Sequence, residues 1–86
     1  MPEISRFFGI TISMYYQEHQ PPHFHARYAA HRASIEIESL AMSAGDMPGR
    51  ALGLVIEWAR QHRTELLDDW DRARAGEPLL PIEPLG

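Results

Sequence analysis

The sequence lacks cysteine and lysine, and it has no long apolar run. Without cysteine, a disulfide framework, a thiolate zinc site and a cysteine nucleophile are all excluded. Small secreted domains usually depend on disulfides, so the missing cysteines favour a reducing cytoplasm. No stretch approaches the roughly 20 apolar residues that span a bilayer, and we therefore expect no membrane segment.

The first 16 residues contain an apolar cluster of the kind that a signal peptide also has. Pro2 and Glu3 stand where such a peptide carries positive charge, and Thr11 and Ser13 interrupt the apolar residues in strict alternation. We interpret this segment as part of the folded protein. The length of 86 residues predicts a single domain over residues 1–86.

Charge is distributed unevenly along the chain. The net charge of −4 disfavours non-specific binding of nucleic acid. Residues 19–35 nevertheless contain no acidic side chain, and they hold Arg27, Arg32 and four of the five histidines. All twelve acidic residues lie outside this segment. The pattern predicts a weakly basic patch on an acidic body.

Alternation of apolar and polar residues predicts three strands, over residues 10–16, 23–28 and 33–38. Pro21 and Pro22 exclude a helix between the first two. The link over residues 29–32 lacks the Gly or Asn that a tight two-residue hairpin prefers, so we expect a longer turn. Together these strands predict a sheet over residues 10–38.

A long amphipathic helix is predicted over residues 47–75. Asp46 is a favourable N-cap, Pro48 fits the first turn, and Gly76 supplies a stop signal. The expected fold is therefore α+β, with a three-stranded antiparallel sheet followed by one long helix packed on one face. A proline-rich tail, residues 77–86, is expected to run extended. The apolar stripe of the helix consists of Ala51, Leu52, Val55, Trp58, Ala59, His62, Leu66, Trp70 and Ala73.

The length of this helix raises a problem. A continuous helix over residues 48–75 would measure about 42 Å, whereas a domain of this size has a diameter of about 30 Å. We expect the helix either to break near Arg63 and Thr64 or to extend beyond the sheet. An extended end would expose Trp70, and the tail, a homodimer contact or another partner would have to cover it.

The segment over residues 19–28 is the richest in chemically active side chains. On a strand, His23, His25 and Arg27 point to one face while the intervening residues point into the core. The simplest interpretation is a solvated face with cross-strand ion pairs, such as Arg27 with Glu36. We call this face, with its neighbours from the other strands, the polar sheet face; it comprises Thr11, Ser13, Tyr15, His23, His25, Arg27, Ser34, Glu36 and Glu38.

Two chemical functions compete with that interpretation. Metal-independent cleavage of RNA needs a base, an acid and a cation for phosphate. His23 and His25 would serve as base and acid, because histidine titrates near neutral pH, while Arg27 binds phosphate and Tyr15 assists. Alternatively, His23 and His25 bind a divalent metal with Glu36, or with His19, as third ligand. Apart from that metal, no cofactor is expected.

A third hypothesis is recognition of a protein or a nucleic acid without chemistry. In this case the same face binds the partner, and further contacts come from His19, Arg32 and Trp70. Enzyme and binding module differ in one consequence. An enzyme loses activity on replacement of His25 but keeps its partner, whereas a binding module shows no turnover.

The string Pro-Pro-His-Phe-His, residues 21–25, is the most specific of several stretches that resemble the bacterial domain-of-unknown-function 4160 family. The turn residues Ala29 and Ala30 depart from the pattern, because such proteins often carry glycine there. The stretches are Pro2-Glu3-Ile4-Ser5-Arg6-Phe7-Phe8-Gly9-Ile10, Tyr15-Tyr16, Pro21-Pro22-His23-Phe24-His25, Arg50-Ala51-Leu52 through Glu57-Trp58-Ala59, and Trp70 with Ala73-Arg74-Ala75-Gly76-Glu77-Pro78-Leu79.

The resemblance implies a small bacterial cytoplasmic protein that is encoded beside another small protein. It therefore implies a component of a two-protein module of toxin–antitoxin type, acting through the polar sheet face. A protein partner encoded nearby and an RNA target follow from that expectation. The resemblance assigns catalysis to no residue, because a fold alone does not define a function.

Overall fold

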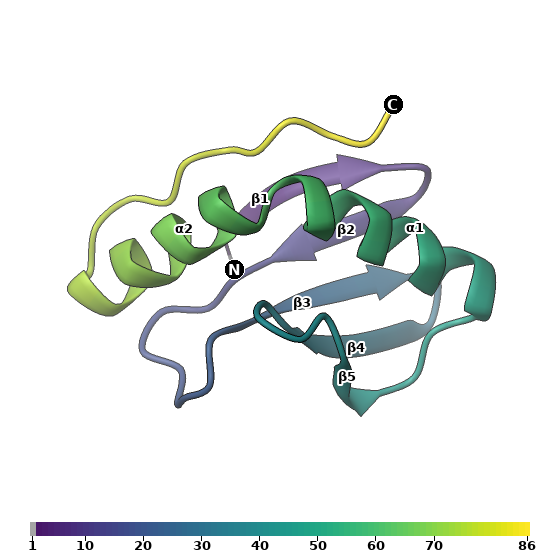
Figure 1. Cartoon of the computed structure of the whole chain (residues 1–86), viewed down its shortest axis with the longest axis horizontal. Coiled ribbons are helices and arrows are strands. Elements are labelled where there is room, and N and C mark those ends of the chain that lie inside the picture. Colours follow the sequence, from purple (N-terminus) through teal and green to yellow (C-terminus); the bar gives the residue numbers. More distant parts are fainter. Residues whose placement is uncertain (1) are drawn as a thin grey trace.

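The computed structural model describes residues 2–86, so Met1, the first residue of the expected domain, lies outside the described residues. Within residues 2–86, five antiparallel strands form one sheet in chain order, and two helices follow (Figure 1). The α+β class and the antiparallel sheet are confirmed, but the expected three strands and single long helix are wrong. The elements are β1 (Glu3–Phe7), β2 (Ile10–Ser13), β3 (His23–Tyr28), β4 (His31–Glu36), β5 (Met42–Gly45), α1 (Gly49–Gln61) and α2 (Arg63–Ala75).

Strand β1 was not predicted from the sequence. It pairs with β2 through a turn at Phe8 and Gly9, whose φ angles of 48° and 78° suit a tight hairpin. A bulge between Glu3 and Ser5 shifts the pairing register by one residue. Because such a bulge breaks the two-residue alternation of side chains, the strand escapes a search for strict alternation.

The turn between β3 and β4 is shorter than expected. Tyr28 pairs directly with His31, so only Ala29 and Ala30 form the turn and β4 begins two residues before the predicted start. Ala29 has a φ of 53°, a conformation that costs about 1–2 kcal/mol for a residue with a Cβ atom. Six cross-strand residue pairs hold the hairpin against this cost.

Strand β5 approaches β4 closely at Gly45. This glycine has a φ of 83°, and a Cβ atom built on it would lie 2.1 Å from the carbonyl oxygen of Arg32. The neighbouring Asp46 N–H donates to the same oxygen at 2.9 Å. Glycine is therefore required here both by the left-handed backbone and by the space available.

Replacing Gly45 with alanine is expected to lower the free energy of unfolding by at least about 2 kcal/mol, because left-handed strain and a backbone clash add together. Gly53 of α1 is the matched control, since a Cβ atom there meets nothing within 4 Å. Gly53→Ala should raise stability by up to about 1 kcal/mol. Urea denaturation of both variants measures the difference, and similar values would contradict the close approach.

The predicted long helix is interrupted at His62. This residue has a φ of −124° and separates α1 from α2. The protein measures 33 × 25 × 22 Å, so a straight helix of about 42 Å would project beyond the sheet. Pro48, not Asp46, occupies the N-cap of α1, while Asp46 Oδ2 lies 2.8 Å from His31 Nδ1. Neither helix of residues 2–86 is long and apolar enough to cross a membrane.

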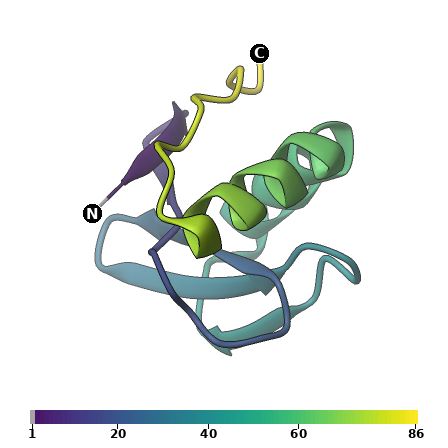
Figure 2. The same cartoon turned by 90° about the vertical axis from the view of Figure 1, so that its left-hand side faces the viewer.

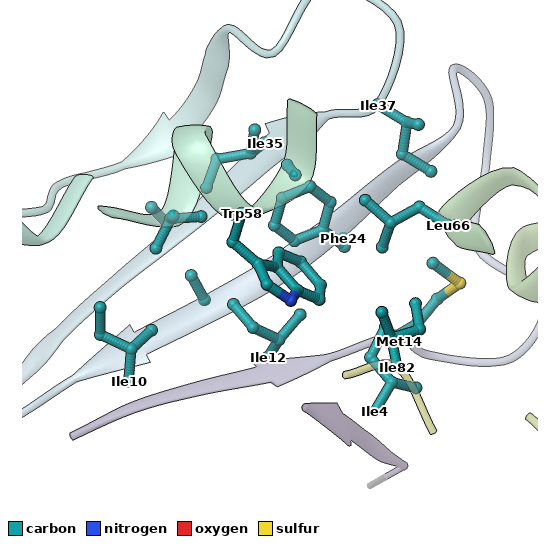
Figure 3. Packing of buried hydrophobic residues seen from close by; sticks show 14 of the residues in the cluster. Ile4, Ile10, Ile12, Met14, Phe24, Ile35, Ile37, Trp58, Leu66 and Ile82 are labelled. Carbon is teal, nitrogen blue, oxygen red and sulfur yellow. The ribbon is translucent and has the colours of Figure 1, made fainter. Parts of the chain in front are cut away.

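The core lies between one face of the sheet and the two helices, which cover that face together (Figures 1 and 2). Alternate residues of the strands point toward the helices, and the intervening residues form the polar sheet face on the other side. Trp58 of α1 and Leu66 of α2 are fully buried against the strands. Figure 3 shows these two side chains with Ile4, Ile10, Ile12, Met14, Phe24, Ile35, Ile37 and Ile82.

The tail, residues 77–86, runs extended along α2 and β1 (Figure 1, yellow). Ile82 N–H donates to the Ile4 carbonyl at 2.8 Å, and Trp58 Nε1–H donates to the Glu83 carbonyl at 2.8 Å. Ile82 itself is 4% exposed and belongs to the core. Because the Ile82 bond covers part of the free edge of β1, the tail protects that edge from pairing with another chain.

Asp69 of α2 anchors the tail from a buried position. Its side chain is 1% exposed, and its Oδ1 accepts a hydrogen bond from Leu80 N–H at 2.9 Å. Burial raises the pKa of the Asp69 carboxyl above its usual value of 3.8, although the Leu80 bond opposes the shift. A raised carboxyl pKa means that stability linked to Asp69 is lost as the pH rises through the folded pKa.

Asp69→Asn is expected to be more stable than the wild type at neutral pH, because asparagine keeps an acceptor for Leu80 N–H without a buried charge. The difference in free energy of unfolding should grow from about pH 4 to about pH 7. Asp69→Ala should instead cost about 1–3 kcal/mol, since Leu80 N–H loses its partner. Urea denaturation across this pH range measures both effects. An asparagine variant that is weaker than wild type at pH 7 would contradict the account.

Candidate metal centre

Glu18, His23 and His25 come together at the beginning of β3. One ligand atom from each residue lies within 4.8 Å of the other two. His23 and His25 are two residues apart on one strand, so their rings project to the same side, with centroids 5.2 Å apart. Glu18 reaches them from the loop that joins β2 to β3. We call these three residues the Glu–His–His cluster.

The carboxylate of Glu18 is shared by the two imidazoles. Its Oε1 lies 3.2 Å from His23 Nε2 and is also in contact with His25 Nε2. Burial raises the pKa of Glu18, but hydrogen bonds and charge from His25 and His23 outweigh it, so the pKa lies below its usual 4.5. Its contribution to stability is therefore present above about pH 4.5 and is lost as the pH falls through the folded pKa.

The other nitrogen of His23 fixes the ring. His23 Nδ1 lies 2.8 Å from the carbonyl oxygen of Pro21, which can only accept a hydrogen bond. Nδ1 therefore carries a proton, and Nε2 faces Glu18. The ring also packs against Trp70 of α2, with centroids 5.3 Å apart, and His23 is only 8% exposed. His23 is thus held in one orientation by the loop and by the helix.

His25 has a looser but similar support. Its Nδ1 lies 3.3 Å from Ser34 Oγ on the neighbouring strand β4. The ring of Tyr15 meets it edge to face at a centroid distance of 4.4 Å. The side chain is 26% exposed, so the cluster is open to solvent on this side. In both histidines, Nδ1 faces away from Glu18 and lies near an oxygen atom with which it can form a hydrogen bond.

Two of the predicted site residues lie outside the Glu–His–His cluster. Glu36, the expected third ligand, lies opposite His23 in the register but accepts a hydrogen bond from Ser39 at 3.0 Å. Arg27 lies opposite Arg32, so the expected cross-strand pair of Arg27 with Glu36 is wrong. Because the turn between β3 and β4 is two residues long, the register places Arg27 opposite the like-charged Arg32.

Of the three predicted binding residues, His19 and Trp70 lie beside His23, whereas Arg32 lies farther along the sheet. His19 lies beside the cluster, with its ring 5.8 Å from that of His23. Arg32 is exposed at the far end of the polar sheet face, on β4. Trp70 is 3% exposed and packs on His23, so it supports the cluster from the core and presents no exposed tryptophan surface. Its role as a surface contact is therefore not compatible with this structure.

Glu18 is the residue that sequence reasoning missed. It lies in an irregular loop, where no two-residue or helical period relates it to the histidines. It also precedes the acid-free segment 19–35 by one residue, so it was assigned to the acidic body. A search for any carboxylate within a few residues of a His-X-His pair would have found it.

A family model described as Domain of unknown function (DUF4160) matches residues 9–71. The match includes β2 to β5, α1 and most of α2, and it contains the whole Glu–His–His cluster. No curated protein and no solved structure matches the chain. The resemblance carried by the Pro-Pro-His-Phe-His string is confirmed, and the chain belongs to the domain-of-unknown-function family DUF4160.

Proposed function

We propose that the protein binds one divalent transition-metal ion through Glu18, His23 and His25. The observation that supports this most is the convergence of two imidazole nitrogens and one carboxylate oxygen within 4.8 Å. Imidazole and carboxylate ligands suit Zn²⁺, Fe²⁺ and related first-row ions. Three protein ligands leave at least one position open, as in catalytic sites rather than structural ones.

The hydrogen bonds behind the cluster favour a cation at its centre. Since His23 Nδ1 donates to the Pro21 carbonyl, Nε2 of the neutral ring has a lone pair directed at Glu18 Oε1, 3.2 Å away. Two acceptors at this distance repel each other. Either a proton on Nε2, with Glu18 as the acceptor, or a metal ion bound to both atoms removes the repulsion.

The outer contacts match those of known metal-binding histidines. Such residues usually donate their second N–H to a carbonyl, a carboxylate or water, which fixes the tautomer and the ring orientation. Pro21 supplies a carbonyl to His23, and Ser34 supplies a hydroxyl to His25. Both rings can therefore direct Nε2 to the same ion while Nδ1 keeps its hydrogen-bond partner.

A second function is favoured by the contact between Glu18 and His25. A carboxylate that orients an imidazole is the usual support of a general base, and His25 also borders a cavity that contains Arg27 and Tyr15. Metal-independent cleavage of RNA is therefore the alternative. It predicts cleavage of a defined RNA that survives a chelator and is lost in His25→Ala.

The biological setting that we propose is a bacterial, cytoplasmic two-protein module of toxin–antitoxin type. Its support is what the family resemblance implies and the exposed position of Arg27 on the polar sheet face. In this setting a protein encoded nearby covers that face. Co-purification of the two proteins, weakened by substitution of Arg27, tests the arrangement, and purification of this chain alone after co-expression contradicts it.

The metal proposal is tested by the metal content of purified protein after incubation with Zn²⁺ and removal of excess ion. We expect about one ion per chain for wild type and almost none for Glu18→Gln. His31→Ala is the matched control, because His31 pairs with Asp46 at 2.8 Å but no third ligand completes that pair in residues 2–86. A wild type without zinc, or an equal loss in His31→Ala, would overturn the proposal.

A further inference from the structure

We infer that the cavity next to the Glu–His–His cluster binds a phosphate group, so that one phosphate-bearing ligand contacts both the cavity and the metal. This inference depends on the proposed metal site in one respect only, namely that a single ligand contacts both the cavity and the metal. The cavity has a volume of about 220 Å³ and lies on the polar sheet face. His25 forms part of its wall and belongs to the cluster as well.

Two arginines lie side by side at this cavity. Arg27 of β3 and Arg32 of β4 are directly paired in the register, and both border the cavity. Like charges directly opposite each other on neighbouring strands are destabilising. Neither guanidinium forms a salt bridge with a carboxylate of residues 2–86, whereas Arg6 and Arg72 each do. An anion between Arg27 and Arg32 would remove the repulsion.

The remaining wall of the cavity suits an anion. Hydroxyl groups come from Thr11, Ser13, Tyr15 and Ser34, and no carboxylate of the described residues borders it. The acidic side chains around the cavity have other partners, since Glu18 contacts His23 and His25, Asp46 pairs with His31, and Glu36 accepts from Ser39. The wall itself therefore carries the positive charge of Arg27 and Arg32, although the net charge of the chain is −4.

The donors also fit the shape of a phosphate. Guanidinium groups bind phosphate oxygens through two parallel N–H bonds, and hydroxyls donate to the oxygens that remain. On β5 the wall consists of Ala44 and Gly45, which have a small side chain or none. A ligand can therefore reach the backbone there without meeting a large side chain. A volume of about 220 Å³ is far more than one water needs and has room for a phosphate group.

The phosphate can belong to a nucleic-acid backbone or to a small phosphate ester. Calorimetric titrations with inorganic phosphate and with a short single-stranded RNA lacking terminal phosphates separate these sources. Both titrations use metal-free protein in the presence of a chelator, so that their result does not depend on the metal site. Binding of the RNA alone assigns a polymer ligand, and binding of inorganic phosphate alone assigns a small ester.

The decisive variant is the double substitution Arg27→Gln with Arg32→Gln. We expect it to weaken binding of the effective probe by at least about tenfold, since two charged contacts are lost. Arg60→Gln is the matched control, because Arg60 is an exposed arginine of α1 away from the cavity. An unchanged double variant, an equal loss in Arg60→Gln, or no binding of either probe to wild type would overturn the phosphate site even if zinc binds.

Discussion

Replacing His25 with alanine is expected to weaken Zn²⁺ binding by more than about 100-fold and to lower the free energy of unfolding only by the loss of its contact with Glu18. Loss of the outer partner of a ligand already costs about 10–100-fold, and His25 supplies a ligand atom itself. Its side chain is 26% exposed, so its removal leaves no large cavity in the core. Competition with a chromophoric chelator measures the affinity, and urea denaturation measures the stability.

Two further substitutions test whether the loss of zinc binding is specific to the Glu–His–His cluster. Ser34→Ala removes only the hydroxyl 3.3 Å behind His25 Nδ1 and should weaken zinc binding by about tenfold. His31→Ala removes a histidine outside the cluster and should leave the affinity unchanged. His23 is less suitable as a probe, because its ring also packs on Trp70 and its loss would disturb the core. Equal effects of the three substitutions would contradict the assignment of ligands.

Trp58→Ala should have the largest effect on stability, a loss of about 3–5 kcal/mol. The indole is fully buried and packs against Phe7 and Phe24 at centroid distances of 5.4 and 5.9 Å. It also holds the tail through the Glu83 carbonyl. Since small domains have a total stability of about 5–15 kcal/mol, the variant should be marginally folded at 25 °C. Urea denaturation followed by far-UV circular dichroism measures this.

Trp58→Phe separates packing from the hydrogen bond. Phenylalanine keeps an aromatic ring among Phe7 and Phe24 but cannot donate to Glu83. We expect much less destabilisation than in the alanine variant, together with faster proteolysis of the tail after its bond to Trp58 is lost. A phenylalanine variant as unstable as Trp58→Ala would mean that the tail bond, and not the packing, dominates at this position.

Strands with a regular pattern were predictable, and strands without one were not. Ile10 and Ile12 alternate with polar residues and indeed face the helices. In β1 a bulge interrupts the alternation, and in β5 all four residues are exposed, so no apolar period marks the strand. β5 forms through backbone pairing with β4 and the glycine at position 45, which hydrophobic patterning does not detect.

The interruption of the helix was foreseeable from its length, and the break predicted near Arg63 and Thr64 lies one residue from the observed one at His62. Comparison of helix length with domain diameter indicated a break or an overhang, and the break lies at His62. No glycine or proline marks that position. The apolar stripe continues through it, and His62 remains on the stripe, with its ring 5.6 Å from Trp58. Tertiary packing therefore sets where the helix ends.

The two histidines of the cluster followed from their spacing, but the carboxylate did not. His-X-His on a strand places both rings on one side whatever the rest of the fold. The position of Glu18 depends on the path of the loop between β2 and β3, which local periodicity does not determine. The same limit explains why Glu36 was chosen, since it lies opposite His23 but its side chain bonds to Ser39.

The most direct test of the metal site is the protonation of the imidazole nitrogens before and after one equivalent of Zn²⁺, observed by long-range proton–nitrogen NMR correlation. We predict that Nε2 of His23 and of His25 shift to metal-bound values while Nδ1 of both rings carries a proton. His19, His31 and His62 should not change. Shifts confined to these other histidines, binding through Nδ1, or no change at His23 and His25 would contradict the Glu–His–His cluster as a metal site.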